Sequence, residues 1–189
     1  AVAAGAGLGL AEMIASGVTC VADMYMHTGT IAEQILEAGI SANLSCGGVY
    51  FGAPEDFSPE TCGDCRNQAA LTEEWHGAGA GQILVDASVH GEYTSNPPLW
   101  RWMAEYAAEH RLGMHVHVSE TQSEHQASLE RWGKTPIQAL DGCGVWDCGR
   151  SLAAHCVYTT EEDWALMAEK GISCVHNPWS NLKLGSGVA

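Results

Sequence analysis

The chain has 189 residues, 46% of them hydrophobic, and a formal net charge of -15 from 23 acidic and 8 basic residues. This hydrophobic content argues against a disordered chain and favours one domain with a sizeable core. The negative charge argues against nucleic-acid and membrane partners, because both anionic surfaces are bound through clustered Lys and Arg. No apolar stretch approaches the roughly 18 residues of a spanning helix, so we expect a cytoplasmic protein.

The eight cysteines allow a disulfide framework, but most of them lie inside apolar runs. Cys20, Cys156 and Cys174 interrupt such runs, where a cysteine is typical of a small hydrophobe on a buried strand. Cys62 and Cys65 form a CGDC pair, and no second pair with the same spacing follows it. We therefore expect reduced, structural cysteines, with a redox or zinc-structural CGDC module as the alternative.

Helical and strand-like segments alternate along the chain. The apolar spacing predicts, in chain order, helix 3–16, strand 18–24, helix 29–38, strand 40–46, a loop to 59, helix 62–76, strand 82–90, helix 97–110, strand 114–119, a helix ending at 132, helix 135–141, strand 151–156, helix 160–170, strand 172–177 and a polar turn to 187. The run 18–24 is typical of a strand buried on both faces. This alternation indicates parallel βαβ units.

Two parallel architectures fit this alternation, an open doubly wound sheet and a TIM-type (β/α)8 barrel. Polar side chains stand at or just past the ends of the predicted strands: Asp23, His90, His117, Glu120, His155 and His176. A barrel gathers all such residues at one rim, whereas an open sheet gathers them only near a switch point, so the barrel is favoured. Six strands are too few to close such a barrel, and a typical barrel has about 250 residues. We therefore expect residues 1–189 to form a partial catalytic barrel domain of a larger enzyme.

The segment His115-Val116-His117 is the strongest local signal for chemistry. Side chains two apart on a strand share a face, and Glu120 follows where the strand gives way to a loop. Neutral imidazoles on rigid strands suit zinc or ferrous iron. The alternatives are a buried structural histidine and a Glu120 that merely caps the helix beginning near Thr121. His90 on another strand end favours the metal interpretation.

Polar residues in two loops have simpler explanations. Asn96 is a plausible N-cap for the proline-started helix, which leaves only His90 in that loop without a role. In the segment 176–187, Pro178 stops strand pairing, and Asn181 is one of several short polar groups predicted to lie in a turn near the site. The remaining histidines are predicted to face solvent: His27, His76, His110 and His125.

The segments GVTCVADMY, SVHGEYTSNP, MHVHVSET, LAAHCVY and HNPWSNLKLGSG occur in this order in the amidohydrolase superfamily. The chain resembles the branch of 5-methylthioadenosine/S-adenosylhomocysteine deaminases and the related chlorohydrolases, guanine deaminases and cytosine deaminases. This resemblance implies a distorted (β/α)8 barrel, of which the chain supplies about strands 2–7. The family's HxH pair on strand one and its aspartate on strand eight would then lie outside residues 1–189. Ser41 stands where nucleoside-specific members tend to carry arginine.

The resemblance also implies roles for particular residues. His117 resembles the metal ligand of the fifth strand, with His115 as a neighbour. Glu120 resembles the catalytic carboxylate that binds the substrate ring and moves a proton, and His155 resembles the catalytic histidine that orients the attacking water. His90 resembles a substrate-binding histidine. The implied cofactor is one divalent metal, zinc, with iron as the alternative.

The implied function is a metal-dependent hydrolase, a deaminase acting on a C–N bond of a purine, pyrimidine or related heterocycle. A divalent metal would activate the water, and the substrate would be a small molecule. The alternatives are a triazine-type chlorohydrolase, another amidohydrolase, or a catalytically incomplete fragment with no activity by itself. We expect the 189-residue chain alone to bind zinc weakly or not at all, and we leave a homo-oligomer open.

Overall fold

The computed structural model describes all of residues 1–189. Its elements are α1 (Val2–Ala15), β1 (Cys20–Met24), α2 (Thr28–Ala38), β2 (Ser41–Ser45), α3 (Gly63–Trp75), α4 (Ala78–Gly81), β3 (Ile83–Val85), β4 (Ala87–Gly91), α5 (Pro97–His110), β5 (Met114–Val118), α6 (Gln122–Trp132), α7 (Pro136–Asp141), β6 (Ser151–His155), α8 (Glu161–Lys170), β7 (Ile172–Val175) and α9 (Pro178–Leu184). Short 3-10 turns cover Pro54–Asp56 and Glu92–Thr94. No helix is long and apolar enough to cross a membrane.

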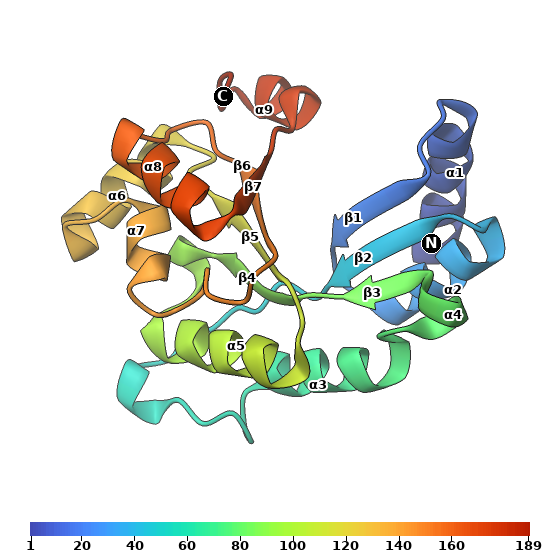
Figure 1. Ribbon diagram of the computed structural model, residues 1–189, viewed down its shortest axis with the longest axis horizontal. Helices are drawn as coiled ribbons and strands as arrows, with labels where there is room; N and C mark the ends of the chain where they lie inside the picture. Colours follow the sequence, from blue (N-terminus) through green and yellow to red (C-terminus); the bar gives the residue numbers. More distant parts are fainter.

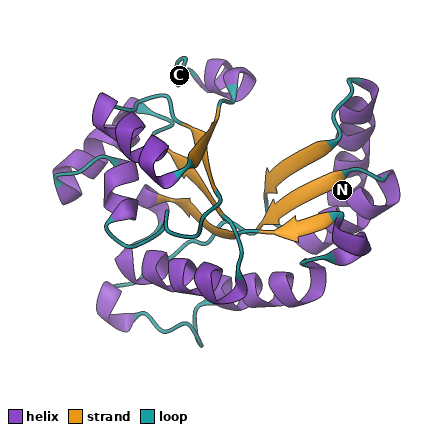
Figure 2. Cartoon of the chain, in the orientation of Figure 1, coloured by secondary structure: helices purple, strands orange, loops and turns teal.

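The strands form two parallel sheets in sequential order, β1-β2-β3 and β4-β5-β6-β7. Figure 1 shows α1 and α2 on the outer side of the first sheet, and α6, α7 and α8 on the outer side of the second. No helix lies between the two sheets (Figure 2). This arrangement is that of a partial barrel wall, and it confirms the predicted parallel α/β architecture.

The predicted strand 82–90 is wrong as a single element, because it divides into β3 and β4 at the buried Asp86. The Asp86 amide donates to Leu44 of β2 (2.9 Å), whereas the Ala87 amide donates to Gly113 before β5 (2.9 Å). The chain therefore changes partner strand within one residue. Arg150 contacts the Asp86 carboxylate at this junction. Apolar periodicity describes one strand at a time and carries no information about such a change of partner.

A second connection joins the sheets where the chain continues past β2. Gly48 forms a parallel bridge with Val89 of β4, in which its amide donates to Ser88 (3.0 Å) and its carbonyl accepts from His90 (2.9 Å). A Cβ atom at Gly48 would lie 2.7 Å from the Met103 side chain and 2.8 Å from the Ser88 carbonyl. Only glycine allows this close approach of two backbones.

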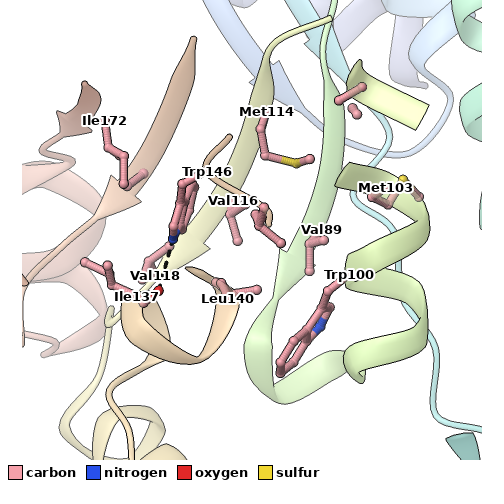
Figure 3. Packing of buried hydrophobic residues seen from close by; sticks show 14 of the residues in the cluster. Val89, Trp100, Met103, Met114, Val116, Val118, Ile137, Leu140, Trp146 and Ile172 are labelled. Atoms are coloured by element: carbon pink, nitrogen blue, oxygen red, sulfur yellow. Dashed lines mark hydrogen bonds between the residues drawn. The ribbon is translucent and has the colours of Figure 1, made fainter. Parts of the chain in front are cut away.

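Each sheet packs on its own hydrophobic core. The core of the second sheet contains 21 buried residues, and that of the first sheet contains 8. In the larger core, Trp146 is almost fully buried and its indole Nε1 donates to the Ile137 carbonyl (3.0 Å) (Figure 3). Val116 and Val118 of β5 face the same cluster (Figure 3). The strands that end near the candidate site therefore belong to the better-packed half.

All eight cysteines are free, as predicted. Cys156 is buried, but Cys20 and Cys174 are exposed, so the prediction of burial is wrong for those two. The two exposed cysteines lie on β1 and β7, the outer strands of their sheets, and β1 is not buried on both faces. A strand with a neighbour on one side only leaves part of its apolar run uncovered.

The remaining differences concern helices and histidines. The segment predicted as a polar turn after residue 176 forms helix α9, with Pro178 at its first position. Helix α4 was not expected from the sequence. His27, His76 and His110 are exposed as predicted, whereas His125 is half-buried.

Candidate functional site

Three histidines meet at the carboxyl ends of neighbouring strands. His90 lies near the end of β4, His117 near the end of β5, and His155 is the last residue of β6. The ring centroids of His90 and His117 are 5.1 Å apart, and those of His117 and His155 are 5.5 Å apart. Parallel pairing places the strand ends side by side, since Val118 of β5 pairs with His155 of β6. The structure thus brings together residues that are 65 positions apart in the chain.

The hydrogen bond made by His117 determines which of its nitrogens is free. Its Nδ1 lies 2.8 Å from the His90 carbonyl oxygen. A carbonyl only accepts, so Nδ1 carries the proton and Nε2 keeps its lone pair. Burial lowers the pKa of His117 to about 4, which keeps the ring neutral. A neutral imidazole with Nδ1 on a carbonyl is the form in which histidine binds metals.

His115 is buried beside His117 and has a different environment. Its Nδ1 lies 3.1 Å from the Ser45 hydroxyl of β2, and its ring centroid is 5.9 Å from that of His117. Burial lowers its pKa to about 4. The Ser45 hydroxyl also lies 3.3 Å from the Asp23 carbonyl of β1. His115 therefore links the second sheet to the end of the first, as a neighbour of the cluster.

The Glu120 carboxylate faces His155, with Oε1 3.6 Å from the imidazole Nδ1. The capping alternative for Glu120 is wrong, because Thr121 and Glu124 cap helix α6. Glu124 accepts from the Ser119 amide (2.7 Å) and from the Glu120 amide (2.8 Å). Glu124 therefore holds the loop that carries Glu120 and leaves the Glu120 side chain available to the site.

His155 has an unusual backbone and a buried amide partner. Its φ is +77° and that of Cys156 is +49°, the left-handed region that non-glycine residues rarely adopt. The Cys156 amide donates to the Val118 carbonyl (3.0 Å) and holds this turn. The His155 Nδ1 lies 2.7 Å from the Asn181 Oδ1 on α9. The polar composition of 176–187 indicated a neighbour of the site, but not this contact.

His90 is half-buried and turns its Nδ1 toward the Thr94 hydroxyl (3.1 Å). That hydroxyl donates to the Gly91 carbonyl (3.1 Å), so it accepts from His90, and the Nε2 of His90 also keeps its lone pair. Burial lowers the pKa of His90, and the charge of Glu120 opposes that effect. Two rings of the cluster, His90 and His117, thus have free Nε2 atoms.

Glu92, two residues past His90, is a buried charged residue near the cluster that no sequence pattern indicated. Its carboxylate is fully buried and accepts from the Arg131 guanidinium (2.7 Å) and from the Trp132 indole. These bonds tie the loop after β4 to the end of α6. By contrast, His176 is exposed and makes no hydrogen bond, ion pair or ring contact with the cluster.

The cluster offers a metal one clear ligand rather than a complete set. No group of three or more His, Cys, Asp or Glu side chains in the chain is placed to hold a metal ion. His117 nevertheless has the ring form and the carbonyl partner of a metal ligand. The donor chemistry of this position therefore fits zinc or ferrous iron.

A family model described as the amidohydrolase family matches residues 1–189. The 5-methylthioadenosine/S-adenosylhomocysteine deaminase of Halothermothrix orenii is 39% identical over 185 residues, which are 98% of this chain and 41% of that protein. The enzyme of the same name from Moorella thermoacetica is 40% identical over 187 residues, 98% of this chain and 42% of that protein. The chain thus spans about two fifths of the length of these relatives.

Two solved structures are similar in fold to this chain. An adenosine deaminase from Xanthomonas campestris with bound zinc is similar over 100% of this chain and 42% of its own, with a TM-score of 0.85 and 28% identity. An atrazine chlorohydrolase from Arthrobacter aurescens, complexed with zinc, is similar over 97% of this chain and 44% of its own, with a TM-score of 0.81 and 21% identity. At the latter identity the similarity concerns the fold alone.

Proposed function

Because the chain belongs to the amidohydrolase family, we propose that it forms part of a hydrolase that deaminates a heterocycle of the adenine type. The observation that carries this proposal is the cluster of three histidines and Glu120 at the ends of β4, β5 and β6. It combines three imidazoles, of which those of His90 and His117 have lowered pKa values, with one carboxylate at the edge where parallel α/β enzymes bind their substrates. The substrate is a small molecule, and the C–N bond that breaks is not a peptide bond.

We propose zinc as the cofactor, with iron as the alternative, and His117 as one of its ligands through Nε2. The zinc in the similar adenosine deaminase supports this choice. A divalent metal supplies Lewis acidity that makes water a nucleophile near neutral pH. The neutral, carbonyl-anchored ring of His117 is suited to hold it.

Each of the other residues has one task in the proposed reaction. Water adds to the ring carbon that bears the amino group, the C–N bond breaks, and ammonia leaves. Glu120 takes the proton that the water gives up and delivers it to the neighbouring ring nitrogen as the carbon becomes tetrahedral, and the hydroxyl proton then passes to the amino group, which leaves as ammonia. His155 orients the attacking water by accepting a hydrogen bond at Nε2. His90 binds the substrate from the side of β4.

The relatives at 39% and 40% identity are named as deaminases of adenine-containing thioethers, which supports ammonia as the leaving group. The chlorohydrolase is similar at 21% identity, and no observation in the cluster favours chloride over ammonia. Ser41, at the position where the resemblance implies an arginine in nucleoside-specific members, is exposed at the start of β2. We therefore propose the adenine-type ring and leave the substituent on it open. We also propose that the protein is cytoplasmic and that it self-associates.

The test measures ammonia release from 5-methylthioadenosine by the protein encoded by the complete reading frame that contains these residues. We expect turnover with zinc, and a fall in kcat of about 10² or more in Glu120→Gln, which keeps the size but cannot deliver a proton. Zinc content and Tm should stay unchanged in that variant.

Glu130→Gln is the matched control, since Glu130 lies exposed on the next helix. It should leave kcat unchanged. An unchanged kcat in Glu120→Gln, together with a lower Tm, would contradict the catalytic role and would indicate a structural one.

A further inference from the structure

We propose that Asn181 is a positioning residue that fixes the tautomer and the orientation of the His155 ring. The proposal rests on the proposed function for its consequence in catalysis, but its geometry is independent of the reaction. The amide Oδ1 lies 2.7 Å from the His155 Nδ1, and both side chains are buried. Asn181 is the one buried residue of α9.

Two acceptors face the same ring nitrogen. The Asn181 Oδ1 is a pure acceptor, and the Glu120 carboxylate Oε1 lies 3.6 Å from the same Nδ1. When the ring carries one proton, these two acceptors favour that proton on Nδ1, so that Nε2 keeps its lone pair. His155 thereby has the same tautomer that the His90 carbonyl imposes on His117.

The backbone around Asn181 keeps its side chain in place. The backbone amide of Asn181 donates to the Asn177 carbonyl (2.9 Å), and its backbone carbonyl accepts from the Ser186 amide (2.8 Å). Gly185, at a φ of +71°, lets the chain turn back to make the second bond. Asn181 is 0% exposed, so the amide has a fixed approach to the ring.

The side-chain amide nitrogen of Asn181 is a hydrogen-bond donor without a partner. Its Nδ2 is buried and makes no hydrogen bond with protein atoms. For packing alone, leucine would fill a similar volume without an unpaired donor. The contact with His155 explains why an asparagine, and not an apolar residue, occupies this buried position.

A rotated amide would have the opposite effect on His155. Placing Nδ2 toward the ring would require a lone pair on Nδ1 and would move the proton to Nε2. The Glu120 carboxylate would then face that lone pair, and two acceptors would repel each other. Glu120 therefore helps to select the amide orientation that keeps Nε2 free.

The experiment determines the tautomer of His155 by long-range ¹⁵N–¹H NMR on the 189-residue chain labelled at histidine. It needs neither metal nor substrate. We expect the Nδ1–H form in the parent chain. Asn181→Leu leaves the Glu120 carboxylate, at 3.6 Å, as the acceptor that remains near Nδ1, so it should raise the fraction of the Nε2–H form, whereas Asn181→Asp, which keeps the nearer acceptor, should retain Nδ1–H.

Asn177→Leu, at the N-cap position just before the same helix, is the matched control, because the Asn177 side chain makes no capping hydrogen bond. It should leave the His155 signals unchanged. Retention of Nδ1–H in a folded Asn181→Leu variant would overturn the proposal. So would the Nε2–H form in the parent chain, which is informative even where Asn181→Leu does not fold.

In the complete enzyme, Asn181→Leu should lower kcat by about 10- to 100-fold, the usual effect of losing such an outer partner, and Asn181→Asp should recover part of it. Failure of the parent enzyme to deaminate would refute the proposed function. The NMR result on the tautomer would still decide the role of Asn181.

Discussion

The two sheets of this molecule differ in packing as well as in chemistry. The first, β1-β2-β3, rests on a core of 8 buried residues, and its outer strand β1 has no buried residue. The second, β4-β5-β6-β7, rests on 21 and carries all members of the histidine cluster. Side chains hold a defined geometry when the strands beneath them are rigidly packed. The site thus lies on the half of the fold best able to fix it.

The largest expected effect comes from removing the central tryptophan of the larger core. Trp146→Ala should lower the free energy of unfolding by about 3–5 kcal/mol, because it opens a cavity and leaves the Ile137 carbonyl without its donor. Leu44→Ala, in the smaller core, should cost about 2 kcal/mol. Urea denaturation followed by circular dichroism measures both.

Trp179→Ala is the control for loss of a tryptophan, since Trp179 is 87% exposed and should change the free energy by less than about 0.5 kcal/mol. Equal costs for Trp146→Ala and Leu44→Ala would contradict the difference between the two halves.

A smaller effect is expected at the junction where β3 gives way to β4. Arg150→Met removes the cation from the buried Asp86 carboxylate and should cost about 1–3 kcal/mol, the range for a buried polar group left without its partner. Arg150 is 47% exposed, which keeps the cost below that of a fully buried pair. The measurement is again urea denaturation.

Arg101→Met is the control, because Arg101 has no ion pair. Equal stability of the two variants would show that the junction does not depend on the contact between Arg150 and Asp86.

The smallest effect concerns pH and the loop that carries Glu120. Burial raises the pKa of Glu124 from 4.5 to about 7, with the backbone amides of Ser119, Glu120 and Thr121 opposing the shift. Between these values the folded chain holds a proton that the unfolded chain releases. The contribution of this group to stability is therefore complete below pH 4.5 and is lost as the pH rises through about 7.

Glu124→Gln keeps one acceptor oxygen for the capping box, loses the bond from the Ser119 amide and cannot ionise, so its free energy of unfolding should vary less between these pH values than that of the parent chain. Urea denaturation at a series of pH values measures the difference. Glu130→Gln, on the exposed face of the same helix, should follow the parent chain. A pH dependence that persists unchanged in Glu124→Gln would refute the raised pKa of Glu124.

The helices and most strands could be predicted because local patterns determine them. The helix predicted at 29–38 is α2, and the proline-started helix at 97–110 is α5 with the same bounds. Apolar residues at helical spacing and a proline at the first position act within a few residues of themselves. The strand-end positions of His90, His117 and His155 followed from the same local patterns.

The contacts that give these residues their chemistry could not be predicted in the same way. Asn181 belonged to a predicted polar turn, and only α9 brings its amide to His155. Glu124, and not Glu120, caps α6, although both carboxylates stand near Thr121. Both outcomes depend on backbone geometry at the strand ends, where φ of Ser119 and His155 is positive.

The amino-acid sequence by itself determined the alternation of helices and strands, the parallel class of the sheet, and the residues that stand at the strand ends. Only the tertiary structure decided that the sheet divides at Asp86, that β1 has no buried residue, and that Nδ1 of His117 carries the proton of that ring. The reason is physical: periodicity is a property of one segment, whereas burial and hydrogen-bond partners depend on segments that meet only when the chain is folded.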